Sequence, residues 1–204
     1  MPAPDRDAGA EAQPVWERIA LCRLCLPRFA ATPTGHAPRP VVWFRPGARL
    51  LIASQAPGMR AHVAGVPFRD ASGDRLRLWM GVSDEEFYDL SRVAIIPMGF
   101  CFPGYDRAGG DIPPPALCAA TWRREALAAV PSVRLALLVG GAAQAWHLGR
   151  GGVTDRVRRW RDFGEAVPLP HPSWRNTAWL KRNPWFESEL LPDLRARVRE
   201  ALDG

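Results

Sequence analysis

The chain has 204 residues, of which 47% are hydrophobic; this is enough to bury one sizeable core and favours a single domain. No uninterrupted apolar stretch approaches the roughly 20 residues that a membrane-spanning helix needs. The net charge of +6 comes from 27 Lys and Arg against 21 Asp and Glu; it suits a polyanionic partner and is equally typical of a solvated basic surface.

The N-terminal segment is predicted to be a flexible tail over residues 1–15, ahead of a single domain over residues 16–204. Residues 1–13 are rich in Ala, Pro and Asp and lack the cationic start and apolar centre of a signal peptide. We therefore expect a cytoplasmic protein. A short helix is predicted over residues 16–21, immediately before a C-x2-C motif.

Helices and strands are predicted to alternate along the rest of the chain. Buried strands are predicted at residues 50–53, 93–98, 135–139 and 166–170. Helices are predicted at residues 75–80, 84–90, 121–130, 142–148, 153–160 and 185–202, the last interrupted near Pro192. Such alternation is typical of a parallel sheet covered on both faces. The expected fold is a three-layer α/β/α domain with a central four-stranded, mostly parallel sheet.

Two loops are predicted between these elements. Residues 58–69 are expected to form a loop that contains Gly65-Val66-Pro67-Phe68. Residues 99–115 are expected to form a longer one, with four glycines and a run of three prolines at its end. Since long loops inside compact domains are usually functional, we expect this segment to contribute to a site.

Polar, Pro- and Gly-containing segments follow the first and the last predicted strand. They are Ser54-Gln55-Ala56-Pro57-Gly58 and His171-Pro172-Ser173-Trp174-Arg175-Asn176. In open α/β sheets, ligands bind outside the carboxyl ends of the strands. The sequence therefore predicts one site that is built from both segments.

The four cysteines are predicted to form a four-thiolate metal centre. Cys22 and Cys25 have the x2 spacing of metal ligands, whereas Cys101 and Cys118 flank the long loop, in which ligands are freely placed. A cytosolic compartment argues against structural disulfides.

Four features in chain order resemble the uracil-DNA glycosylase superfamily, and most closely its iron–sulfur branch, over residues 20–190. The loop Gln55-Ala56-Pro57-Gly58 is similar to the first motif of that branch, with Ser54 and Gln55 in place of the usual Gly and Glu. Gly65-Val66-Pro67-Phe68 resembles the segment with the base-stacking aromatic, and His171-Pro172-Ser173 resembles the histidine motif of the DNA-intercalating loop. The cysteines fall where that branch places its cluster ligands.

The resemblance implies a base-excision repair enzyme that extrudes a base from DNA and hydrolyses its N-glycosidic bond. Phe68 would stack on the flipped base, and residues 55–58 would line its pocket. His171 would donate a hydrogen bond to the pyrimidine O2 as negative charge develops there. Ser173, Trp174, Arg175 and Asn176 would contact DNA. Cys22, Cys25, Cys101 and Cys118 would hold a 4Fe-4S cluster, with zinc as the main alternative.

Two positions depart from the family pattern. Ala56 stands where the best-studied branch has a water-orienting aspartate, so backbone groups or another carboxylate must orient the water. Asp70 is the candidate carboxylate, with helix capping as its alternative role. Pro97 falls where relatives have an asparagine that reads the uracil edge. Since proline offers neither an amide side chain nor a backbone N–H, the pocket is also expected to admit other deaminated bases.

The expected activity is a monofunctional DNA glycosylase, acting as a monomer on DNA that contains uracil or another deaminated base. Lys181 is the only lysine, and its position does not favour Schiff-base chemistry. A non-catalytic binder of damaged or single-stranded DNA is the alternative, because Ala56 and Pro97 remove two polar pocket groups. A nucleotide or RNA hydrolase is a weaker alternative, indicated only by Gly140-Gly141. We expect His36 and His147 to be structural or solvated, and His62 as well, with positioning of water as its alternative role.

Overall fold

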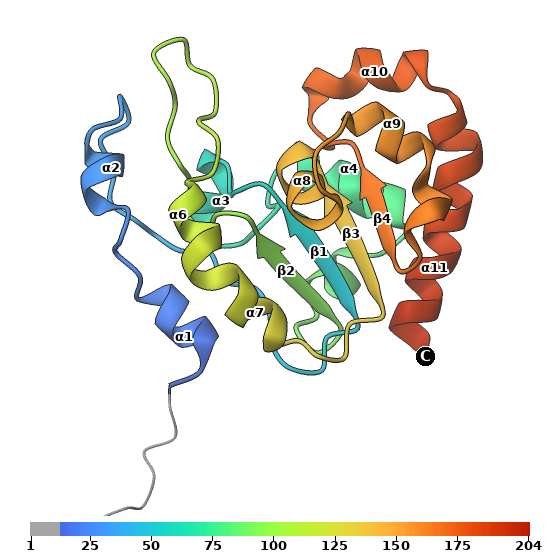
Figure 1. The fold of residues 1–204 in the computed structure, drawn as a ribbon, viewed down its shortest axis with the longest axis horizontal. Coiled ribbons are helices and arrows are strands. Elements are labelled where there is room, and N and C mark those ends of the chain that lie inside the picture. Colours follow the sequence, from blue (N-terminus) through green and yellow to red (C-terminus); the bar gives the residue numbers. More distant parts are fainter. Residues whose placement is uncertain (1–12) are drawn as a thin grey trace, which may run out of the picture.

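The computed structural model describes residues 13–204 (Figure 1). The expected flexible tail lies outside the described residues up to residue 12, and the first helix, α1, spans Val15–Ala20. No helix in residues 13–204 is both long enough and apolar enough to cross a membrane.

Four parallel strands form the central sheet, as the alternation of apolar segments predicts. They are β1 (Leu50–Ser54), β2 (Val93–Pro97), β3 (Leu135–Val139) and β4 (Ala166–Leu169), in the spatial order β2-β1-β3-β4. The chain passes from β1 to the edge strand β2 and then returns to the other side of β1. The topological switch point therefore lies between β1 and β3, where open α/β sheets bind ligands.

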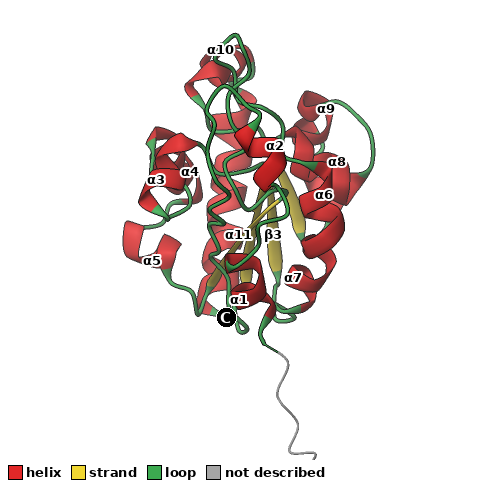
Figure 2. Cartoon of the chain, turned by 90° about the vertical axis from the view of Figure 1, so that its left-hand side faces the viewer, coloured by secondary structure: helices red, strands yellow, loops and turns green. Residues whose placement is uncertain are grey.

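Helices cover both faces of the sheet, which confirms the three-layer α/β/α prediction (Figure 2). Because side chains alternate along a strand, Leu50 and Ile52 face one layer while Leu51 and Ala53 face the other. The first layer contains α4 (Ala71–Met80), α5 (Asp84–Tyr88) and α11 (Leu191–Asp203). The second contains α1, α7 (Arg124–Ala128) and α8 (Gly141–Leu148).

Several helices differ from the sequence-based expectation. The predicted loop at residues 58–69 contains a helix, α3 (Met59–Ala64), which ends at Gly65 in the left-handed conformation. The helix predicted at residues 121–130 starts earlier, as α6 (Ala116–Cys118), a π-helical turn η1 (Ala119–Arg123) and then α7. The helix predicted at residues 185–202, with an interruption near Pro192, is found as a π-helical turn η4 (Phe186–Leu190) followed by α11. The change falls next to Pro192, which lies in the first turn of α11, where its missing N–H has no partner to lose.

The remaining helical segments are short and lie near the ends of larger elements. The unpredicted ones are α2 (Leu26–Ala30) and α10 (Thr177–Arg182). The others are α9 (Val153–Arg158) and two 3-10 turns, η2 (Trp160–Phe163) and η3 (Trp174–Asn176). The long loop after β2 and the helix α10 both rise beyond the arrowheads of the strands, and together they flank the carboxyl edge of the sheet (Figure 1).

Candidate active site

A cleft of about 1410 Å³, open to solvent, lies outside the carboxyl ends of β1, β2 and β4. Its walls include Gln55, Phe68, Asp70, Pro97 and His171, so the structure brings together segments that are distant in the sequence. The two predicted strand-end segments both line it. The site predicted from both segments therefore exists as one cleft.

Gly140, at the end of β3, allows these two segments to meet at the switch point. It has a φ of +83°, and a Cβ built on it would lie 3.1 Å from Gln55 Nε2 and 3.6 Å from His171 Cβ. A side chain at this position would therefore be both strained and crowded. The glycine lets the backbone of β3 pass directly beneath Gln55 and His171.

His171 follows β4 after one residue, Pro170, and is held in one tautomer by its own loop. The backbone N–H of Ser173 donates to His171 Nδ1 at 3.2 Å. Because a backbone N–H can only donate, Nδ1 must be the unprotonated nitrogen, and the ring proton of the neutral imidazole is on Nε2. The side-chain amide of Asn176 donates to the backbone oxygen of His171 at 2.7 Å and fixes the residue further.

The environment of His171 favours its neutral form. Burial lowers the pKa of the imidazole below its usual range, and Arg175 adds to that effect, while Asp70 and Asp111 oppose it. At neutral pH the side chain is therefore a neutral imidazole with a hydrogen-bond donor at Nε2. Such a group can stabilise negative charge on a partner without carrying a charge itself.

Phe68 has the only left-handed backbone among the non-glycine residues of the described chain, with a φ of 55°. Strain of this kind in an aromatic residue persists only where the surroundings impose it, and it is concentrated at functional sites. Gly73 makes the conformation possible, since a Cβ there would lie only 1.8 Å from Phe68 O. The ring packs edge-on against Phe87, with centroids 6.0 Å apart, and lines the cleft.

Asp70 caps helix α4, which confirms the capping alternative. Its Oδ1 accepts hydrogen bonds from the backbone N–H groups of Ser72 and Gly73, each at 3.0 Å. Both bonds use the same oxygen. Oδ2 lies toward the first motif, 4.0 Å from a Cβ built on Gly58, so one carboxylate oxygen is left for the cleft.

Ala56 and Pro97 both line the cleft, and neither offers a polar side-chain atom. The backbone after Pro97 is tied to the first motif, because Met98 N–H donates to Ser54 O at 2.8 Å and Gly99 N–H donates to Gln55 O at 2.9 Å. These bonds fix the wall of the cleft through backbone atoms alone.

The loop after His171 places two large side chains at the mouth of the cleft. Trp174 is 74% exposed, which is unusual for its size. The Arg175 guanidinium lies 5.5 Å from the centre of the Trp174 ring and 3.5 Å from Asp111 Oδ2, on the long loop opposite. Ser173 and Asn176, by contrast, are occupied inside the loop, where the Ser173 hydroxyl oxygen accepts from Arg175 N–H at 3.3 Å.

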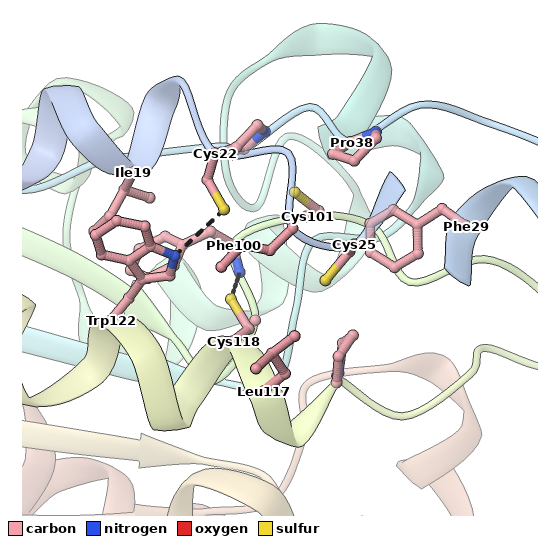
Figure 3. A pocket seen from close by; sticks show the side chains of 14 residues that line it. Ile19, Cys22, Cys25, Phe29, Pro38, Phe100, Cys101, Leu117, Cys118 and Trp122 are labelled. Atoms are coloured by element: carbon pink, nitrogen blue, oxygen red, sulfur yellow. Dashed lines mark hydrogen bonds between the residues drawn. The ribbon is translucent and has the colours of Figure 1, made fainter. Parts of the chain in front are cut away.

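A second, narrow cavity is lined by Cys22, Cys25, Cys101 and Cys118. Figure 3 shows the four sulfur atoms around a common space, with apolar side chains between them. Two N–H groups donate to these sulfurs: Trp122 Nε1 to Cys22 and Phe100 N to Cys118, each at 3.4 Å. The structure thus brings the two predicted halves of the cysteine centre together.

Two thiols of this cavity, those of Cys101 and Cys118, are poor nucleophiles on their own. Burial raises the pKa of Cys101 to about 12 and that of Cys118 to about 11, and the neighbouring cysteines add to the increase. Without a metal to displace their protons they are neutral at physiological pH. No three His, Cys, Asp or Glu side chains within residues 13–204 are close enough to surround a single metal ion.

The sequence model of the uracil DNA glycosylase superfamily matches residues 42–195, which is about three quarters of the chain. The chain belongs to the uracil DNA glycosylase superfamily. The match contains every wall of the cleft named above, together with Cys101 and Cys118, whereas Cys22 and Cys25 lie before it. Members of this superfamily are DNA glycosylases, hydrolases that act on DNA and remove uracil-like bases.

The sequence did not indicate two residues that line or support this cleft. Asp111 lines it from the long loop, whose length was the only signal in the sequence. Arg75, on α4, donates to the backbone oxygen of Ser173 at 3.0 Å and so holds the histidine loop; no local pattern indicates this contact. His36 and His62 pack together away from the cleft, with ring centroids 5.4 Å apart, consistent with structural roles.

Proposed function

We propose that this protein is a monofunctional DNA glycosylase that hydrolyses the N-glycosidic bond of uracil in DNA and leaves an abasic site. The observation that carries the proposal is the neutral imidazole of His171, which lines the same cleft as Phe68, an aromatic residue with a strained backbone. A simple DNA-binding scaffold needs neither this tautomer nor this backbone conformation. The target base would be extruded from the stack before the reaction.

Phe68 and His171 divide the work on the extruded base. The ring of Phe68 stacks on the base, a contact worth about 1–3 kcal/mol. When the bond between C1′ of the sugar and N1 of the base breaks, both electrons leave with the base, and negative charge develops on O2. His171 Nε2–H donates to O2 more strongly as this charge grows; one preorganised donor of this kind contributes about 2.7–4 kcal/mol.

Asp70 orients the attacking water. Its Oδ1 is held by the helix cap and its Oδ2 is left toward the cleft, so the carboxylate is rigid and has one acceptor available. It accepts a proton from the water as the water adds to the oxocarbenium-like sugar. In this proposal the helix cap and the catalytic role are two functions of one side chain.

The base pocket also admits deaminated bases other than uracil. Pro97 and Ala56 present no polar side-chain atoms to the base, so no asparagine-like group selects the uracil edge. Shape, stacking on Phe68 and the single donor on His171 then decide which bases enter. Hypoxanthine and xanthine are the bases on which this expectation is tested.

Trp174 and Arg175 contact the DNA around the vacated position. The exposed Trp174 ring fills the gap in the base stack, and Arg175 exchanges its partner Asp111 for a phosphate. Exchange is easy because the ion pair with Asp111 is long and exposed, and such pairs contribute about 0–1 kcal/mol. Ser173 and Asn176 act on DNA only indirectly, through the shape of the loop.

The four cysteines hold a 4Fe-4S cluster, which serves to join the N-terminal segment to the end of β2 and to α6. The residues fit such a group, because four thiols and two N–H donors to sulfur surround one apolar cavity. A single tetrahedral zinc ion would need sulfur atoms only about 3.8 Å apart, given Zn–S bonds of about 2.3 Å. No three His, Cys, Asp or Glu side chains within residues 13–204 surround a single ion, whereas a cluster would take one thiolate from each cysteine at a different iron atom.

The decisive experiment uses oligonucleotides that contain uracil, hypoxanthine or xanthine, single- and double-stranded, followed by alkaline cleavage of abasic sites. We expect cleavage at uracil by the wild type, and none by His171→Ala. The alternative, a binder of damaged DNA, is favoured by the apolar Ala56 and Pro97. Tight binding to an oligonucleotide that remains intact would support it and would refute the glycosylase.

A further inference from the structure

Arg123 is a buried cation with no carboxylate partner. It is 1% exposed and ends the π-helical turn η1, which follows Cys118. Its Nη1 donates to the backbone oxygens of Ile96 and Pro97, both at 3.1 Å, and its Nη2 donates to His147 Nε2 at 2.6 Å. None of the ion pairs found within residues 13–204 includes Arg123.

The positive charge of Arg123 persists in this setting. Burial lowers the pKa of the guanidinium to about 10, so it is protonated at neutral pH. His147 must accept at Nε2 and is therefore neutral; burial, and then Arg123, lower its pKa to about 4. The Trp146 ring lies 4.8 Å from the guanidinium carbon and adds a further neutral contact. The hydrogen-bond partners of Arg123 within residues 13–204 are thus all neutral, and none of them offsets its charge.

Burying a cation only to bind backbone carbonyl groups is unfavourable for the stability of the protein. Placing a charge in the interior without a carboxylate carries a desolvation cost that neutral acceptors only partly offset. A neutral amide side chain would satisfy the same carbonyl groups without that cost. The charge of Arg123 therefore indicates a role beyond holding the carbonyl groups at the end of β2 in place.

Arg123 lies directly behind the wall of the base pocket. Ile96 and Pro97 are the last two residues of β2, and Pro97 lines the cleft. In a regular strand, successive carbonyl groups point to opposite sides. Here two successive carbonyl groups bond to one Nη1, so Arg123 fixes the bend at which the strand ends. Its charge is separated from the cleft by the Pro97 backbone.

We propose that Arg123 is a positioning residue that acts on the base pocket through the Pro97 backbone, and that its uncompensated charge favours departure of the base as an anion. This inference rests on the proposed glycosylase function. The bond that breaks joins C1′ to N1, both electrons leave with the base, and water supplies the oxygen that replaces it. A fixed positive charge behind a pocket wall of low dielectric stabilises this separation of charge without touching the base.

The leaving-group dependence of the reaction tests the charge. Fluorine at C5 withdraws electrons and stabilises the anionic base, so 5-fluorouracil needs less help from the protein. We expect Arg123→Gln to lower the single-turnover rate at uracil about tenfold or more at saturating enzyme, and the rate at 5-fluorouracil by less than about threefold. Arg123→Lys, which keeps the charge, should recover most of the uracil rate. Equal losses on both bases, or a loss only in DNA binding, would overturn the proposal.

A second pair of variants separates the effect of the Arg123 charge from that of its hydrogen bonds to β2. This pair also tests the proposal if Arg123→Gln does not fold. His147→Glu places a carboxylate beside Arg123 and cancels its charge while the hydrogen bonds to β2 remain. His147→Gln is the matched neutral control and should keep the wild-type rate on both bases. We expect His147→Glu to reproduce the selective loss at uracil with an unchanged or higher thermal midpoint.

The outcomes separate this inference from the function on which it rests. A folded His147→Glu protein with the wild-type uracil rate refutes the inference alone, provided the wild type cleaves both substrates. A wild type that is inactive on both bases refutes the glycosylase function, and the role of Arg123 with it.

Discussion

Gly73→Ala tests whether the strained conformation of Phe68 is required for activity. The added Cβ would lie 1.8 Å from Phe68 O, whereas real Cβ contacts essentially never fall below 3.0 Å. The Phe68 backbone must therefore move by at least about 1.2 Å, or the first turn of α4 must open. Overpacking of this kind costs about 1–3 kcal/mol of stability. A displacement of about 1 Å at a positioned group lowers the rate about 100-fold.

The assay is single-turnover cleavage of a uracil oligonucleotide, with urea unfolding on the same samples. Gly141→Ala is the matched control, because its Cβ would meet Val153 Cγ2 at an ordinary 3.4 Å in the first turn of α8. In a Phe68→Ala background, Gly73→Ala should cause little further loss of rate, since both changes act on one ring. A Gly73→Ala rate within threefold of the wild type, or losses that add fully, would refute the reasoning.

Three further expectations concern single side chains. Asp70→Asn should keep the cap of α4, because Asn caps as well as Asp, while the uracil rate falls about 100-fold; a loss of stability instead would leave only the structural role. The pKa of His147 falls from 6.5 to about 4 on folding, so the unfolded state binds the extra proton and stability falls as pH drops through that window. Solvent screening at this half-buried ring limits the decrease in the free energy of unfolding to about 1–2 kcal/mol. In urea unfolding at several pH values, His147→Gln should lack this decrease. Cys22→Ser should release iron and visible absorbance from the purified protein; a colourless wild type that yields zinc contradicts the cluster.

The carboxyl edge of the sheet could be predicted because its signals are local. Each strand is a short apolar run, and a histidine directly after the last one can only lie at the rim of the sheet. The cleft confirms that placement, with His171 and Gln55 on either side of Gly140. The helix α3 was missed because Gly58 and Gly65, which bound it, are also typical loop residues.

The contacts that tune the site could not be predicted, because they join residues far apart in the chain. Arg123 meets Pro97 and His147 across 26 and 24 positions, and no local pattern marks an arginine for burial without a carboxylate. The left-handed backbone of Phe68 likewise has no signal in its own sequence. It becomes intelligible only when Gly73 is seen beneath it.

One helix organises most of the proposed chemistry. The first turn and a half of α4 supplies the cap at Asp70, the space beneath Phe68 at Gly73, and the bond from Arg75 to the Ser173 carbonyl. Ser173 N–H in turn sets the tautomer of His171. Helix α4 therefore positions three parts of the site: the ring that would stack on the base, the carboxylate that would orient water, and the loop of the anion-stabilising donor. Because α4 packs on α11 and on the sheet core, their relative positions are set on folding, before any DNA arrives.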